Sequence, residues 1–280
     1  MIRDSVLTVT VFDDAGNPIS GAGVTWTGDG TVAGGTTTGS DGSATGTWTL
    51  GQTSGPNTVT ANVGPLSVDF TANGAAGPAV TPTYSTVPPS GTAGLGLPPI
   101  TVTVVDQFGN PREGDAVTWT VTSGGGSISA SSTATGADGT SAVTWTLGQA
   151  VGSNALRVEV AGPTQPFTQD FTVQGLVGAA VQPVTTTGDG QTGTVGQPLA
   201  SPLTILVTDQ FGNPRAGEDV SWNDGASTTT VPTDASGLSS YTWTLGTVAG
   251  SQSASASVGS FSPVSFSATA NPGAAANLAS

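Results

Sequence analysis

The sequence predicts an all-β protein built from three copies of one small β-sandwich module. Its tryptophans form two sets: one ends a Val-x-Trp triplet in each copy, and the other lies within Thr-Trp-Thr-Leu-Gly. The first set is Trp26, Trp119 and Trp222, and the second is Trp48, Trp145 and Trp243. Each set recurs about every hundred residues, which is the size of a whole domain and too long for a solenoid repeat. The 42 Gly and 19 Pro, with abundant Thr, Ser and Val, favour strands and turns over helices.

Each copy has a strand of alternating apolar residues followed by a turn motif. Leu7, Val9 and Val11 share one face in the first copy, as a half-buried strand requires. Their counterparts are Ile100, Val102 and Val104, then Leu203, Ile205 and Val207. The motif Asp-x-x-Gly-Asn-Pro follows at 13–18, 106–111 and 209–214. Its aspartate can accept backbone N–H groups, its Gly and Asn tolerate positive φ, and its Pro fixes the exit, so we interpret it as a turn.

The two tryptophan strands follow, separated by variable stretches with room for one or two short strands (28–39, 123–136 and 223–233). Tight turns at 41–42, 138–139 and 236–237 precede the second tryptophan strand. Both tryptophans fall on the inward parity in every copy, so we predict a tryptophan pair in each core of this cysteine-free chain. The alternative, tryptophans as sugar-stacking platforms, does not explain that parity.

The remaining strands complete the fold prediction. Each copy ends in strands that carry Val59, Leu156 or Ala254 and then Phe70, Phe171 or Phe266. Copies two and three also have a leading strand, at 79–85 and 180–186. About seven strands in a hundred residues, with a Trp on the third, match an immunoglobulin-like sandwich. We therefore predict three tandem immunoglobulin-like β-sandwich domains arranged end to end as a rod. The predicted ranges are 1–76, 77–177 and 178–273, and 274–280 begins a further repeat or forms a subunit-contacting tail.

These motifs resemble a known family. Asp-x-x-Gly-Asn-Pro at 13–18, Asp-Gly-x-Ala at 41–44 and Val-x-Ala-x-Val at 59–63 are similar to the bacterial immunoglobulin-like (Big-1) repeats of the invasin/intimin type. The resemblance covers nearly the whole chain in three copies, although Trp stands where many members have Phe or another apolar residue. It implies an extracellular or cell-surface protein whose modules form stalks, spacers or assembled structures and sometimes carry adhesion.

Composition restricts the partners. The chain has 4 Lys+Arg against 18 Asp+Glu, for a net charge of −14, so we expect no nucleic-acid partner. No apolar run approaches the roughly 20 residues of a membrane span, so we expect no membrane insertion within this chain. Without His, Cys or Lys, the usual activated nucleophiles and His-based metal sites are excluded, and we predict a protein that is not an enzyme. Glu113, Glu159 and Glu218 lie in loops or on outward strand positions, where paired-carboxylate catalysis has no scaffold.

No cofactor is expected, with calcium as the alternative. Asp13, Asp14 and Asp41 are predicted to converge at one end of the first copy, with Asp106 and Asp138 as counterparts in the second. Clustered loop carboxylates suit Ca²⁺. These residues equally fit turn and capping roles, and the third copy replaces the Asp-Gly turn with Ser236-Gly237.

The junctions between copies are short, so we predict a stiff rod on the order of 110 Å long. Phe108 and Phe211 lie in the loop predicted to face the preceding copy, whereas the first copy has Ala15. Arg112 and Arg215 follow in the same loop. We predict that the Phe side chains pack into the junctions and that the Arg side chains pair with acids of the preceding copy. The alternative is chance divergence among the three copies.

The predicted function is a rigid stalk or a head-to-tail filament subunit, and the alternative is an adhesin module that binds a host or glycan ligand. The first copy has about 15–17 fewer residues before its turn motif than the other two. One explanation is a cut through a longer array. The other is a strand supplied by another subunit through the tail that contains Leu278, which predicts head-to-tail self-association. Other surface proteins or glycans are the remaining expected partners.

Overall fold

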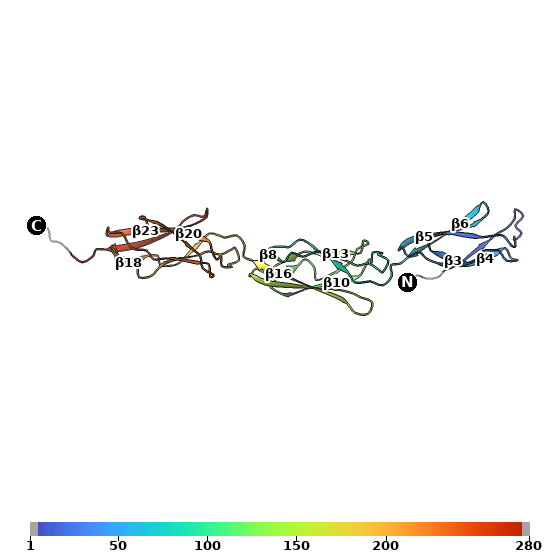
Figure 1. Cartoon of the computed structure of the whole chain (residues 1–280), viewed down its shortest axis with the longest axis horizontal. Coiled ribbons are helices and arrows are strands. Elements are labelled where there is room, and N and C mark those ends of the chain that lie inside the picture. Colours follow the sequence, from blue (N-terminus) through green and yellow to red (C-terminus); the bar gives the residue numbers. More distant parts are fainter. Residues whose placement is uncertain (1–4, 276–280) are drawn as a thin grey trace.

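The computed structural model describes residues 5–275, and all regular structure in that range is β-strand. The predicted all-β class is confirmed. The strands form three groups that follow one another along a single long axis (Figure 1). We call them the first module (β1–β6), the second module (β7–β16) and the third module (β17–β24). Over the same described range, the chain has no helix able to cross a membrane.

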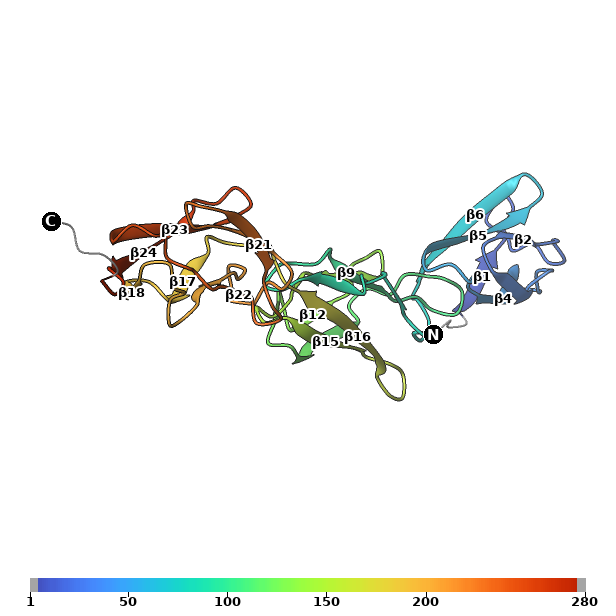
Figure 2. The ribbon, with the colours of Figure 1, turned by 60° about the vertical axis from the view of Figure 1, so that its left-hand side comes forward.

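The first module has two three-stranded sheets that face each other (Figure 2). One sheet has the order β1-β4-β3 and the other the order β2-β5-β6. The strands are β1 (Ser5–Thr10), β2 (Thr25–Gly28), β3 (Thr31–Gly34), β4 (Ser43–Thr49), β5 (Gly55–Val63) and β6 (Leu66–Gly74). All pairs are antiparallel, and Leu7 lies opposite Gly46 across β1 and β4. Leu7 and Trp48 from one sheet pack with Val59 from the other in the core.

The second module has the sheets β12-β10-β15-β16-β8 and β13-β9-β7, with a short β11-β14 pair. Its strands are β7 (Thr83–Tyr84), β8 (Ser90–Thr92), β9 (Ile100–Thr103), β10 (Ala116–Ser123), β11 (Ser127–Ile128), β12 (Ser132–Ala134), β13 (Thr140–Val143), β14 (Trp145–Thr146), β15 (Gly152–Val160) and β16 (Phe167–Leu176).

The third module repeats this plan with the sheets β18-β24-β23-β20-β21 and β17-β19-β22. Its strands are β17 (Val184–Thr187), β18 (Gln191–Thr194), β19 (Leu203–Leu206), β20 (Asp219–Asn223), β21 (Thr228–Pro232), β22 (Leu238–Tyr241), β23 (Gly250–Val258) and β24 (Val264–Asn271).

A leading segment closes one side of the second and third modules. It pairs first with one sheet and then with the other: β7 is antiparallel to β9, and β8 is parallel to β16. The third module does the same with β17 on β19 and β18 on β24. Among residues 5–275, no strand occupies this place beside β1 and β6 of the first module.

Five of the six tryptophans are buried in the cores, and Trp26 is half-buried. Their ring contacts differ from the predicted tryptophan pairs. Trp26 packs against Phe70 with ring centroids 5.9 Å apart, and Trp222 packs against Phe266 at 5.5 Å. Both contacts reach across a small residue of the intervening strand, because Ala61 lies opposite Trp26 and Ala256 lies opposite Trp222.

The second module has the bulkier Val158 opposite Trp119. Its Phe171 instead contacts Tyr84 of the leading segment, with ring centroids 5.9 Å apart. The Trp–Phe contact thus occurs in the two modules with alanine on the middle strand, and the Phe–Tyr contact occurs in the module with valine there.

Candidate functional site at the module junctions

The turn that ends each opening strand is organised by its aspartate. The carboxylate of Asp106 accepts hydrogen bonds from the backbone N–H groups of Phe108 (2.8 Å) and Asn110 (3.0 Å) and from the Asn110 side-chain amide (2.9 Å). Gly109 has a φ of 82°, which glycine adopts without strain. The same bonds recur around Asp13 and Asp209. The motif therefore makes the same local turn in all three modules.

The asparagine of this turn also binds the preceding module. The Asn110 amide donates to the carbonyl oxygen of Gln52 (2.7 Å), and its carbonyl oxygen accepts the N–H of Ser54 (2.9 Å). Both partners are backbone groups in the loop between β4 and β5. One side chain thus satisfies a donor and an acceptor of the neighbouring module at once.

The second junction repeats this contact. Asn213 donates to the carbonyl oxygen of Gln149 (2.8 Å) and accepts the N–H of Val151 (3.2 Å). Asn110 and Asn213 are each 8% exposed, whereas Asn17, which makes the same turn in the first module, is exposed. The preceding module accounts for the difference in burial.

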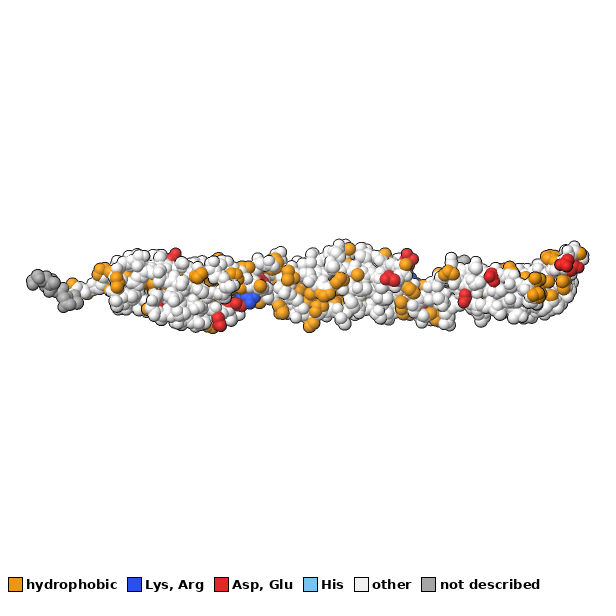
Figure 3. Space-filling view, turned by 90° about the horizontal axis from the view of Figure 1, so that it is seen from above, with side chains coloured by type: hydrophobic (Ala, Val, Ile, Leu, Met, Phe, Trp, Pro, Cys, Tyr) orange, Lys and Arg blue, Asp and Glu red, His pale blue; other side chains and the backbone are white. Residues whose placement is uncertain are grey.

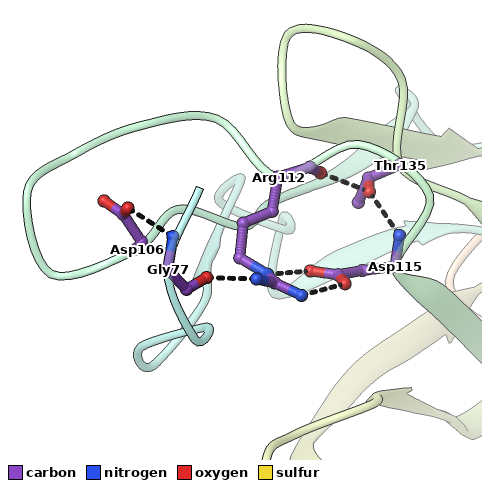
Figure 4. Close-up of polar contacts among 5 residues, drawn as sticks. All are labelled: Gly77, Asp106, Arg112, Asp115 and Thr135. Carbon is purple, nitrogen blue, oxygen red and sulfur yellow. Dashed lines mark hydrogen bonds and ion pairs between the residues drawn. The ribbon is translucent and has the colours of Figure 1, made fainter. Parts of the chain in front are cut away.

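A second set of contacts holds the linker between modules (Figure 4). Asp106 accepts the N–H of Gly77 at 2.7 Å, and the guanidinium of Arg112 donates to the carbonyl oxygen of the same glycine. Arg112 is itself held by a bidentate pair with Asp115, with both N–O distances at 2.7 Å. The backbone N–H and the carbonyl oxygen of Gly77 are therefore both hydrogen-bonded to side chains of the second module.

The third module holds its linker in the same way. Asp209 accepts the N–H of Gly178 at 2.9 Å, and Arg215 donates to the carbonyl oxygen of Gly178. Glu218 takes the place of Asp115 and accepts a hydrogen bond from Arg215 Nε at 2.9 Å.

The prediction that Arg112 and Arg215 pair with acids of the preceding module is wrong. Their carboxylate partners, Asp115 and Glu218, lie three residues further along in the same module. The physical reason is that these acids are local and preordered by the loop, so they pair with the guanidinium at little entropic cost. On the side that faces the preceding module, each arginine donates instead to a backbone carbonyl oxygen, that of Gly77 or Gly178.

The two junction phenylalanines are placed differently. The ring of Phe211 packs onto Gly94 of the second module so closely that a Cβ at Gly94 would lie 2.2 Å from a ring carbon. Phe108 is 43% exposed and borders a hollow at the first junction together with Leu50 and Ala75. Both side chains lie at the junctions, and Phe211 makes the tighter contact.

The hydrogen bonds at the junction lower the pKa of its aspartates. Burial acts to raise the pKa of Asp106, but bonds from the Asn110 side chain and from the N–H groups of Gly77, Asn110 and Phe108 outweigh it. They hold the pKa at about 2, below the usual 3.8. Burial and an equivalent set of bonds act on Asp209, and its pKa is also lowered. The hydrogen bonds from the linker glycines to Asp106 and Asp209 therefore depend on ionised carboxylates. We call the contacts of Asn110 and Arg112, and of Asn213 and Arg215, the junction clamp.

The acids predicted to converge as calcium ligands do not form one cluster among the described residues. The carboxylate oxygens of Asp13 and Asp106 accept hydrogen bonds within their own turns. Asp41 and Asp138 accept the backbone N–H groups of Ser43 and Thr140. Asp14 completes no cluster, because residues 5–275 contain no group of three or more acidic side chains spaced to hold a metal ion. Turn formation disperses these carboxylates. Leu278, predicted to contact another subunit, lies outside the described residues.

Reasoning from sequence missed the role of Asn110 and Asn213. The asparagine is present in all three copies, so comparing copies gave it only a turn role. The sequence differences that did indicate the junction are Phe108 and Arg112 in the second copy, where the first copy has Ala15 and Ile19.

Comparisons with known proteins agree with this architecture. Residues 94–174 match the family model of the bacterial Ig-like domain (group 1), which confirms the resemblance drawn from the motifs over most of the second module. The structure of InvD from Yersinia pseudotuberculosis is similar with a TM-score of 0.53 at 17% identity, covering 94% of this chain and 91% of that chain. No curated protein sequence matches.

Two further solved structures match less well. The adhesin InvE of Y. pseudotuberculosis has a TM-score of 0.32 at 19% identity over 73% of this chain and 63% of that chain. The D0-D1 domain of intimin has a TM-score of 0.28 at 21% identity over 66% and 94%. Of these three structures, InvD alone has a TM-score above 0.5, and at 17% sequence identity that similarity shows a shared fold. The chain is thus a tandem array of immunoglobulin-like sandwiches.

Proposed function

We propose that this chain is a non-enzymatic, rigid spacer of a bacterial cell surface, in which tandem immunoglobulin-like modules hold other parts of an assembly at a fixed distance. The observation that carries the proposal is the repetition of one backbone-directed clamp at both junctions. Asn110 and Asn213 bind the preceding loop, and Arg112 and Arg215 grip the linker glycine. A chain whose modules only needed tethering would not require these contacts.

Side-chain distribution supports a structural role over ligand binding. Binding sites for glycans usually present exposed aromatic rings, but five tryptophans are at most 1% exposed. Among large hydrophobic side chains of residues 5–275 that are exposed, the aromatic ones are Phe12 and Phe108. Figure 3 shows few charged side chains on that face, most of which is backbone and side chains that are neither hydrophobic nor charged. The net charge of −14 favours solubility and disfavours acidic partners.

The bacterial surface enters the proposal through the family match to the bacterial Ig-like domain (group 1) and through the invasin/intimin-type resemblance of the sequence motifs. The absence of His, Cys and Lys from the sequence supports a protein without catalysis. Its role would then depend on length and stiffness.

The test compares shape in solution. Small-angle scattering on the purified chain should give the maximum dimension of a straight rod, and the double variant Phe211→Ala/Asn213→Ala should give a shorter, broader distance distribution with every module still folded. Asn17→Ala is the matched control, because it removes the same turn bond where no described module precedes it. A wild-type chain that bends as freely as the double variant would overturn the proposal. Binding to a glycan array that survives Phe211→Ala/Asn213→Ala would instead favour an adhesive function.

A further inference from the structure

In the second and third modules, the leading segment pairs directly with the strand by which the chain leaves the module. In the second module, β8 pairs in parallel with β16 through residues 90–92. In the third module, β18 pairs in parallel with β24 through residues 191–194. We call each of these two pairings the axial strand pair of its module.

The linkers at the two ends of a module act on these strands in opposite directions. The leading segment of the second module starts at the first junction, where Asp106 holds Gly77, and reaches β8 at the far end of the module. β16 runs in the same direction and continues into the linker that Asp209 holds at Gly178. In Figure 1, β8 and β16 lie together at the end of the second module next to the third. Tension along the rod therefore draws β8 back towards the first junction and β16 forward towards the third module.

This geometry loads the axial strand pair in shear. Hydrogen bonds between paired strands lie across the strand direction, so a pull along the strands loads all of them at once. A pull that separates the two strands from one end loads them one after another. Forced unfolding is governed by the unfolding rate, and bonds that must break together slow it more than bonds that break in turn.

The axial strand pair of the second module is short because two prolines precede it. Gln174 donates its N–H to the carbonyl oxygen of Pro89 (2.9 Å), and Ala93 donates to that of Leu176 (2.8 Å). Pro88 and Pro89 have no N–H to donate. The leading segment therefore offers β16 no backbone donor from these two positions.

The third module adds three hydrogen bonds just before β18. Gly190 donates its N–H to the carbonyl oxygen of Ser267 on β24 (2.9 Å). The carboxylate of Asp189 accepts the N–H (2.8 Å) and the hydroxyl (3.1 Å) of the same serine. These bonds join the same two strands as the axial strand pair and extend it by one residue of β24.

The second module has no residues able to make these contacts. Gly91 and Gly193 each lie against core leucines in their axial strand pair, and they align the two leading segments. Three residues earlier, the third module has Gly190 where the second has Pro88. One residue before that, it has Asp189 where the second has a valine. Because proline lacks the donor and valine lacks the acceptor, the third module has the more extensive pair.

We propose that the axial strand pairs bear the load when the chain is under tension along its axis, and that Asp189 makes the third module more resistant than the second. Under rising tension the second module yields first and lengthens the array while the third stays folded. The inference rests on residues 77–273, all of which the structure describes. It adds force transmission to the proposed spacer role, and the strand geometry that carries it does not depend on that role.

The test pulls single molecules of the full chain in two directions. The chain has no cysteine, so exposed residues changed to cysteine serve as attachment points. Ala75→Cys with Val177→Cys pulls the second module along its axis. Ala75→Cys with Thr164→Cys, in the turn between β15 and β16, separates the leading segment and β16 from one end. The axial pull should require at least about twice the force, because the same bonds then break together.

The third module tests the role of the aspartate. Ala179→Cys with Ala274→Cys pulls this module along its axis and should require more force than the second module. Asp189→Ala should remove at least about half of that difference, because it deletes two of the three added bonds. With Ala179→Cys and Ser260→Cys, which separate the strands from one end, Asp189→Ala should have a smaller effect. Asp219→Ala is the matched control, since Asp219 is an exposed acid on β20 and two strands lie between β20 and β18.

Two sets of results would overturn the proposal. Equal forces for the two pulling directions would show that the axial strand pair does not bear the load. A third module that yields at or below the force of the second, or an equal loss from Asp219→Ala, would remove the role of Asp189. A chain that bends freely in scattering but resists the axial pull would contradict the rigid spacer and leave this inference standing.

Discussion

Replacing Asn110 with alanine should undock the first module from the second without unfolding either. The substitution removes the bonds to the Gln52 carbonyl oxygen and the Ser54 N–H, together with the turn bond to Asp106. A hydrogen bond contributes a net 0.5–1.5 kcal/mol, so the two bonds across the junction amount to about 1–3 kcal/mol. That free energy corresponds to a roughly 5- to 150-fold fall in the ratio of docked to undocked modules. Asn17→Ala loses only the turn bond, so the difference between the two variants isolates the contribution of the junction.

The assay measures distances between paired labels. The chain has no cysteine, so single cysteines at the equivalent exposed positions Thr71 and Thr172 can be labelled without background. Single-molecule energy transfer or pulsed dipolar spectroscopy should give one narrow distance distribution for the wild type and for Asn17→Ala. The distribution for Asn110→Ala should be broad. Equal widths for all three proteins, or equal broadening by Asn17→Ala, would refute the clamp.

The remaining predictions concern the cores and the junction carboxylates. Trp48→Ala should destabilise the first module by about 3–5 kcal/mol in denaturant unfolding, as a large-to-small change at a buried site; a loss below about 1 kcal/mol would contradict that core. Trp119→Phe should destabilise more than Trp145→Phe, by about 1 kcal/mol, since Trp119 Nε1 donates to Thr133 while Trp145 Nε1 has no partner among the described residues. The pKa of Asp106 is about 2 in the folded chain against 3.8 ordinarily, so its stabilising effect is complete above about pH 4 and is lost as the pH falls through 2. Scattering measured across that range should show the rod loosening on acidification, and an unchanged profile would exclude the carboxylate clamp.

Strand placement was predictable because alternation and turn chemistry are local. Leu7 and Val102 fall on the inward face by simple parity, and both are buried. Trp26 follows the same parity but is only half-buried, because β2 is an edge strand of its sheet, whereas β10 and β20 have a strand on each side. Likewise, Trp26 contacts Phe70 across Ala61, whereas Val158 lies opposite Trp119, and only the strand register reveals which residue stands between them.

The junction was predictable in place but not in chemistry. Phe108 and Arg112 differ from their first-copy counterparts, and that difference located the loop. The principal contact is made by Asn110, and its partners are the backbone groups of Gln52 and Ser54. A contact to backbone leaves no mark in the side chains of its partner, so no pairing pattern in the sequence could show it.

That property has a consequence for how such arrays change in evolution. The loops read by Asn110 and Asn213 differ in sequence, with Gln-Thr-Ser at 52–54 and Gln-Ala-Val at 149–151, yet they offer the same carbonyl and N–H. The hydrogen bonds from this asparagine therefore require no particular side chain in the loop of the preceding module, whereas the contact of Phe211 requires the glycine at position 94. Gene duplication and unequal recombination can lengthen or shorten the array in single steps, and the asparagine hydrogen bonds re-form at each new junction. The length of the protein is in this sense a heritable variable that is separate from the sequence of its modules.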